Sequence, residues 1–74
     1  MPFQSLSGRS QAARQHRALS TWRSTARLVR ECWGDCLAAD RAGRVGAFAA
    51  YDAALDLEAA AADELAVLAL KRVA

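Results

Sequence analysis

The sequence predicts an all-α protein, an antiparallel two-helix hairpin of coiled-coil type that dimerises into a four-helix bundle. Nineteen alanines and nine leucines stand against one proline and no isoleucine in 74 residues, a composition that favours helices and gives a sheet little to use. Apolar residues recur every three to four positions in both halves of the chain, which is the period of a helix that buries one stripe. A chain this short has room for one domain, which we place at residues 10–74.

The first half of the chain is predicted to be a short arm followed by a long helix. Residues 1–9 contain a proline, a glycine and two serines, which disfavour regular structure and indicate a flexible arm. Ser10 is suited to cap a helix that runs to about residue 42. Gly34 does not disturb the phase of the apolar stripe, so we expect the helix to continue through it. The predicted stripe consists of Ala12, Leu19, Trp22, Ala26, Val29, Trp33 and Cys36.

A turn at residues 43–46 is predicted to lead into a second helix over about residues 47–73. Gly43 can end the first helix in the left-handed conformation, and Gly46 can begin the next. Because the connection is short, the two helices should be antiparallel neighbours. Folding at the turn then places Trp33 opposite Leu55. The predicted stripe of the second helix consists of Phe48, Tyr51, Leu55, Ala59, Ala62, Leu65, Ala69 and Val73.

The charges are sorted along the chain. The first thirty residues hold six arginines and no acid, whereas residues 31–74 hold all eight acids and four bases. In the predicted hairpin Arg30 lies near Glu58, and Arg23 and Arg27 lie within reach of Asp63 and Glu64. Exposed pairs of this kind contribute about 0–1 kcal/mol each, so their expected role is to select register and orientation.

Residues 65–70 are apolar on nearly every side of the second helix, which indicates burial on more than one face. A single hairpin cannot provide that burial, and so small a chain gains little stability from its own core. We therefore predict a homodimer or a small subunit of a larger protein complex. The residues predicted to serve this association are Leu65, Val67, Leu68 and Leu70, with Trp22 and Trp33 anchoring the hairpin.

The sequence offers little for catalysis or for a cofactor. It contains no phosphate-binding glycine loop and no hydrolase or metalloprotease motif. Cys32 and Cys36 lie four residues apart on one helical side, and we expect small buried thiols there, with zinc shared between two chains or a redox role as alternatives. His16 lies about 30 Å from Cys36 along a helix, too far to join it. We predict no enzyme, no cofactor, no metal and no small-molecule substrate.

The leading hypothesis is a small non-enzymatic protein–protein interaction module, such as an adaptor, an assembly subunit or a regulatory partner of a larger protein. The alternative is a nucleic-acid-associated regulator, because forked arginine side chains suit phosphate contacts. The sequence shows neither a signal peptide nor a membrane-spanning run, so a cytoplasmic location is expected. The candidate phosphate-binding residues are Arg14, Arg17, Arg23 and Arg27.

Overall fold

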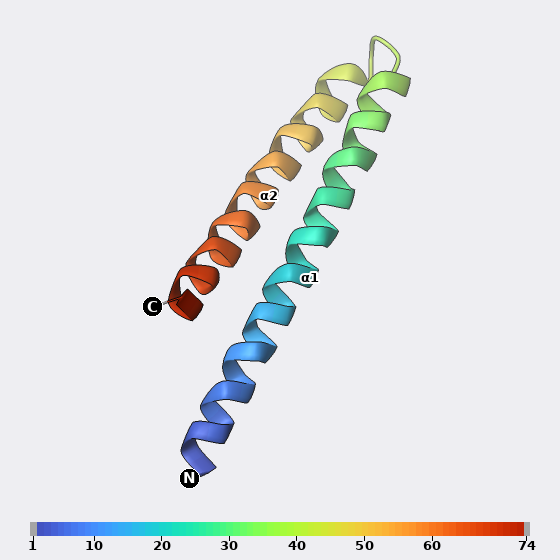
Figure 1. Ribbon diagram of the computed structural model, residues 1–74. Helices are drawn as coiled ribbons and strands as arrows, with labels where there is room; N and C mark the ends of the chain where they lie inside the picture. The colour runs from blue at the N-terminus through green and yellow to red at the C-terminus, as the bar shows by residue number, and fades with distance from the viewer. Residues whose placement is uncertain (1, 74) are drawn as a thin grey trace.

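The computed structural model describes the backbone of residues 2–73 and the side chains of residues 10–71. This part of the chain is all-helical and contains two helices, α1 (Pro2–Ala38) and α2 (Arg44–Val73). The helices run antiparallel and side by side along a rod of 62 × 17 × 12 Å (Figure 1). The predicted all-α hairpin is therefore confirmed.

The ends of α1 differ from the prediction. The helix begins at Pro2, so residues 2–9 are helical rather than an irregular arm, and Ser10 does not cap a helix. Proline is well suited to the first helical position, because its fixed φ matches the helix and its missing N–H has no partner there. The helix passes through Gly34 as predicted, but it ends at Ala38 rather than at about residue 42.

The turn comes earlier than predicted and is built on Asp40. The Gly43 amide donates a hydrogen bond to Asp40 Oδ1 at 2.8 Å. The Ala47 amide donates to the Gly43 carbonyl oxygen at 3.0 Å, which makes Gly43 the N-cap of α2. No glycine in the described residues has a positive φ. The predicted left-handed Gly43 and the predicted turn at residues 43–46 are therefore wrong, and Gly46 lies inside α2.

Burial shows which side of each helix faces the other. The residues with the least exposure recur with alternating steps of four and three in both helices, which is the spacing of a coiled-coil contact. We call these two rows the seam. The α1 row is rotated from the predicted stripe by one residue at alternate positions, so Ala18 replaces Leu19 and Cys32 replaces Trp33. The seam consists of Gln15, Ala18, Trp22, Thr25, Val29, Cys32 and Cys36 from α1 and Ala47, Tyr51, Ala54, Glu58, Ala61, Leu65 and Leu68 from α2.

The register of the seam sets large residues against alanines. Counted along both rows from the contact between Trp33 and Tyr51, Trp22 falls level with the buried Ala61, and Val29 falls level with Ala54, which is only 1% exposed. Such pairing lets two helices approach closely while still filling the space between them. The rings of Trp33 and Tyr51 are 5.2 Å apart, centroid to centroid. The predicted pairing of Trp33 with Leu55 is therefore wrong by about one helical turn, because the earlier turn moves α2 along α1.

Candidate interaction surface

One long side of the hairpin is apolar along its whole described length. Every second seam position is followed by a residue that lies on this side of the hairpin in both helices, as in other antiparallel pairs with a seven-residue repeat. These seam positions are Ala18, Thr25 and Cys32 in α1 and Ala47, Ala54, Ala61 and Leu68 in α2. Phe48 and Tyr51 stack edge to face with centroids 6.2 Å apart, and Trp33 also meets Tyr51, so the flanks of α1 and α2 do join on this side. We call it the apolar face. It consists of Ala12, Leu19, Ala26 and Trp33 from α1 and Phe48, Leu55, Ala62 and Ala69 from α2.

The opposite side of the hairpin is mixed. Leu28 and Leu57 are exposed there, but half of its flanking positions are charged. Water can solvate such a surface, whereas an uninterrupted apolar surface is typical of a binding site. We call this side the mixed face. It consists of Arg14, Thr21, Leu28 and Asp35 from α1 and Ala50, Leu57, Glu64 and Lys71 from α2.

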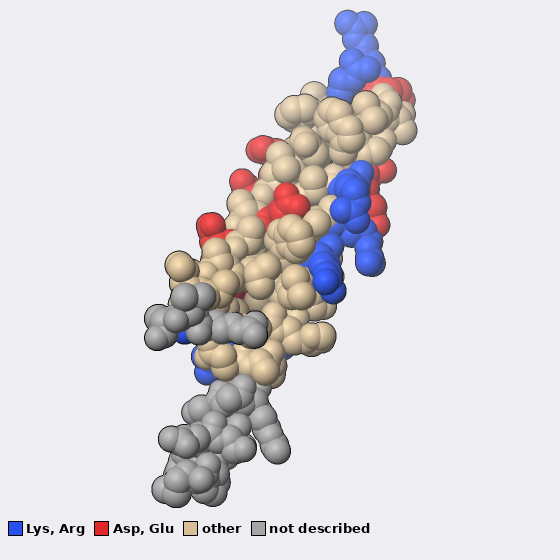
Figure 2. All heavy atoms as spheres, in the orientation of Figure 1, with Lys and Arg blue, Asp and Glu red and all other residues tan. Residues whose placement is uncertain are grey.

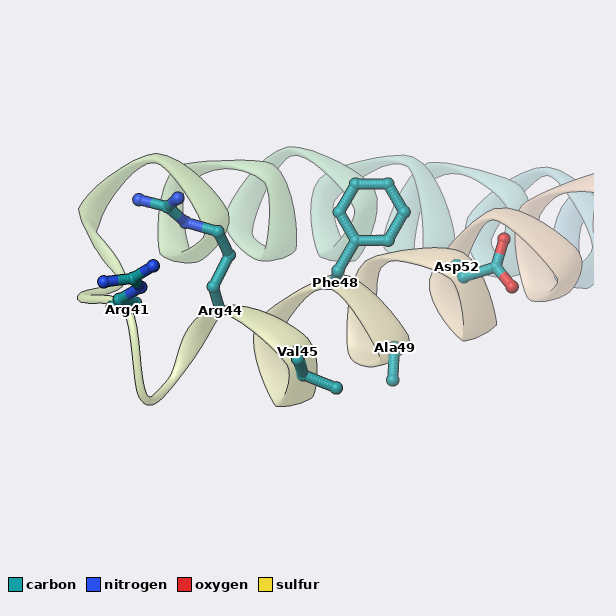
Figure 3. Close-up of a pocket in the computed structure, with 6 residues that line it drawn as sticks. All are labelled: Arg41, Arg44, Val45, Phe48, Ala49 and Asp52. Carbon is teal, nitrogen blue, oxygen red and sulfur yellow. The ribbon is translucent and has the colours of Figure 1, made fainter.

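The apolar face is most open near the turn. Trp33 is 47% exposed and Phe48 is 58% exposed, and Leu37 and Val45 beside them are exposed as well. A shallow hollow of about 500 Å³ adjoins Phe48, with arginines at its turn end and Asp52 at its other end (Figure 3). Large apolar side chains left in water at one place offer the anchors that a partner helix can cover. The residues that line the hollow are Arg41, Arg44, Val45, Phe48, Ala49 and Asp52.

Charged side chains lie beyond the apolar face on both edges of the hairpin. On α1 the next positions round the helix are His16, Arg23 and Arg30, and we call them the basic rim. On α2 the same positions hold Asp52, Ala59 and Ala66, and the acids Asp56 and Asp63 lie one position further round, on the outer side of α2. We call Asp52, Asp56 and Asp63 the acidic rim. Figure 2 shows basic atoms over the middle of α1 and acidic atoms along the outer edge of α2. The two rims lie on opposite edges of the hairpin and do not meet within one chain.

The ion pairs predicted between the helices are not formed. Among the side chains of residues 10–71, no arginine or lysine pairs with a carboxylate. Arg23, Arg27 and Arg30 are exposed because their positions in the repeat point away from α2. Their charges are therefore available to groups outside the hairpin.

The residues predicted to serve association lie on different sides. Leu68 is only 7% exposed and, with the half-buried Leu65 and Trp22, lies in the seam. Val67 and Leu70 are 50% and 70% exposed and point away from α1. Trp33 lies on the apolar face. The predicted stripe placed Phe48 in contacts within the hairpin, whereas Phe48 is 58% exposed on the apolar face.

The two cysteines are free thiols in the seam. Both are half-buried, and their rows place Cys32 level with Tyr51 and Cys36 level with Ala47. In the described part of the chain no three histidine, cysteine or acidic side chains gather where they could hold a metal ion. The thiols thus contribute small apolar volume to the packing of α1 on α2.

The candidate phosphate-binding arginines are exposed but do not form one row. Arg14 lies on the mixed face, Arg23 lies on the basic rim, and Arg17 and Arg27 lie on the outer side of α1. A nucleic-acid strand on one side of α1 would contact some of them and not the others. No helix within residues 2–73 combines the length and apolarity needed to cross a membrane.

Comparison with known proteins identifies no relative from which a function could be inferred. The chain matches no family model, no curated protein and no solved structure. A functional assignment therefore rests on what the apolar face and its charged rims can bind.

Proposed function

We propose that this chain is a small non-enzymatic protein–protein interaction module that binds through its apolar face. The observation that carries the proposal is the balance of burial. Among the described side chains only Ala18, Ala54, Ala61 and Leu68 are buried, whereas eight large apolar side chains are exposed, Trp33 and Phe48 of the apolar face among them. A thin seam whose buried residues are mostly alanine stabilises the hairpin weakly, so a partner that covers the apolar face supplies the missing core.

The surface area supports the same proposal. The chain exposes 5848 Å², about 1,400 Å² more than a compact monomer of its mass, which exposes about 4,400 Å². An interface that covers this excess in each of two chains falls within the range of obligate homodimers. A dimeric four-helix bundle is thus the simplest assembly for the module, and the same face also suits an adaptor or a subunit of a larger complex.

The proposal predicts that two substitutions on the apolar face prevent association. Trp33→Ser with Phe48→Ser should raise the Kd of self-association at least tenfold, about 1.4 kcal/mol, because two exposed aromatic anchors are lost. Sedimentation equilibrium measures the Kd, and circular dichroism verifies that the helices persist. At concentrations low enough to keep both proteins monomeric, the variant should bind less anilinonaphthalene sulfonate, a dye that reports exposed apolar surface.

The matched control lies on the mixed face. Leu28→Ser with Leu57→Ser removes two large apolar side chains, 38% and 55% exposed, from the other side of the hairpin. This pair should leave the Kd within about twofold of the unmodified value. If the control pair weakens association as much as the first pair does, the apolar face is not the binding surface.

A second candidate function is nucleic-acid-associated regulation, favoured by the exposure of Arg14, Arg17, Arg23 and Arg27 without a paired carboxylate. In this case Arg14→Gln with Arg17→Gln should weaken binding of a duplex DNA, and the slope of log K against log salt should fall by about two. Fluorescence polarisation over a salt series measures both quantities. If the affinity and the slope do not change, Arg14 and Arg17 do not contact nucleic acid.

A further inference from the structure

We propose that the partner on the apolar face is a second copy of this chain, laid lengthwise so that both turns lie at the same end. The arrangement rests on the proposed function, and it adds the identity and the orientation of the partner. In this dimer α1 of each copy covers α2 of the other, around a twofold axis parallel to the rod. Every helix then has antiparallel neighbours, as in an up-and-down bundle.

The charged rims select this orientation. Because α1 of one copy covers α2 of the second, Arg30 lies beside Asp52 of the second copy at the edge of the interface, and Asp56 and Asp63 lie on the same edge further out. Within one hairpin Trp22 lies level with Ala61, so Arg23 lies within about one helical turn of Asp63 and Asp56 along the axis. Rotation about a twofold axis parallel to the rod leaves each residue at the same position along the rod, so the same spacings hold between Arg23 of one copy and the aspartates of the other. Arg30 likewise lies within about one turn of Asp52 and Asp56 of the second copy.

The other twofold arrangement brings like charges together. If the axis runs across the face, α1 covers α1 of the second copy and α2 covers α2. The arginines of the basic rim then face arginines, and the aspartates of the acidic rim face aspartates. Like charges placed opposite each other disfavour an interface and thereby select against the wrong orientation.

The aromatic side chains favour the same orientation. In the lengthwise dimer Trp33 of one copy lies level with Tyr51 and close to Phe48 of the second copy, at the end where exposure is greatest. Both copies contribute such a cluster at that end, so the most exposed aromatic surface is covered on both sides. In the crosswise dimer the two clusters lie at opposite ends and face small or charged positions.

A spin-label distance tests the orientation directly. Ala42 is exposed in the turn, so Ala42→Cys, with Cys32→Ala and Cys36→Ala, carries one label in each chain. The lengthwise dimer predicts a label-to-label distance of about 20 Å, roughly two helix diameters. The crosswise dimer predicts about 45 Å or more, since the 30 residues of α2 separate the two turns. The longer distance would overturn the proposed orientation.

Charge reversal on the rims provides the second test. Arg23→Glu with Arg30→Glu makes both rims acidic and should raise the dimer Kd at least tenfold. Adding Asp56→Arg and Asp63→Arg to the same chain restores opposite rims and should return the Kd to within about threefold of its original value. No change on the first reversal would contradict the role of the rims.

The outcomes separate this inference from the proposed function. A chain of monomeric mass that still binds the apolar dye through Trp33 and Phe48 would overturn the second copy as partner and keep the interaction module. A chain that is monomeric and binds no dye would overturn both. A particle that carries nucleic acid and dissociates at high salt would also overturn the second copy.

Discussion

Replacing Ala54 by glutamate is expected to unfold the hairpin. Ala54 is 1% exposed and lies in the seam level with Val29. A glutamate there must either bury an unpaired carboxylate, at a cost of about 3–5 kcal/mol, or push the helices apart. For a chain with so small an interior, that cost is comparable to the whole free energy of unfolding. Circular dichroism should show a large loss of helicity.

The matched control for this prediction is the neighbouring residue. Ala53 is exposed on the outer side of α2, and Ala53→Glu replaces the same side chain by the same group one residue away. Its effect on the free energy of unfolding should stay within about 0.5 kcal/mol, as for surface substitutions in general. Equal loss of helicity in the two variants would show that Ala54 does not face α1.

The second large effect is expected at Leu68. Leu68 lies in the seam and is the only large side chain among the four buried residues of the described part of the chain. Leu68→Glu removes this contact and brings a carboxylate into the interface between the helices, so we expect loss of at least about 3 kcal/mol and unfolding of the C-terminal part of α2. Urea denaturation at fixed protein concentration measures the change.

Leu70 provides the comparison, because it is 70% exposed and lies two residues further along α2. Leu70→Glu should change the free energy of unfolding by less than about 0.5 kcal/mol and should leave the mass of the assembly unchanged. If Leu70→Glu dissociates the assembly while Leu68→Glu does not unfold the chain, the binding surface lies on the outer side of α2.

The helical fold could be predicted from composition and period, but the facing sides could not. The apolar stripe of α1 is wide, because Leu19 and Ala18, or Trp33 and Cys32, are adjacent and both suited to burial. The seam also contains Gln15, Thr25 and Glu58, which a hydrophobic pattern assigns to solvent. The Thr25 hydroxyl is satisfied within α1, because Oγ1 donates a hydrogen bond to the Trp22 carbonyl oxygen at 2.8 Å. A polar residue satisfied in this way is invisible to a pattern of hydrophobicity.

The register could not be predicted because it depends on one side chain. Gly43 and Gly46 both carry turn signals, and the sequence analysis placed the turn between them. The Asp40 carboxylate instead accepts the Gly43 amide, which starts α2 at Arg44. This shift moves α2 by about one helical turn along α1. The arginines do not meet the acids because their positions in the repeat point away from α2. The charge sorting was visible in the sequence, but its place at the rims of an apolar face required the structure.

The central claim is that a second copy covers the apolar face in solution. Light scattering on a size-exclusion column in reducing buffer tests it most directly, because mass is measured independently of shape. We expect twice the chain mass of 7.9 kDa for the unmodified protein and the mass of one chain for Trp33→Ser with Phe48→Ser at low concentration. A helical particle with the mass of one chain at every concentration, before any substitution, would contradict it.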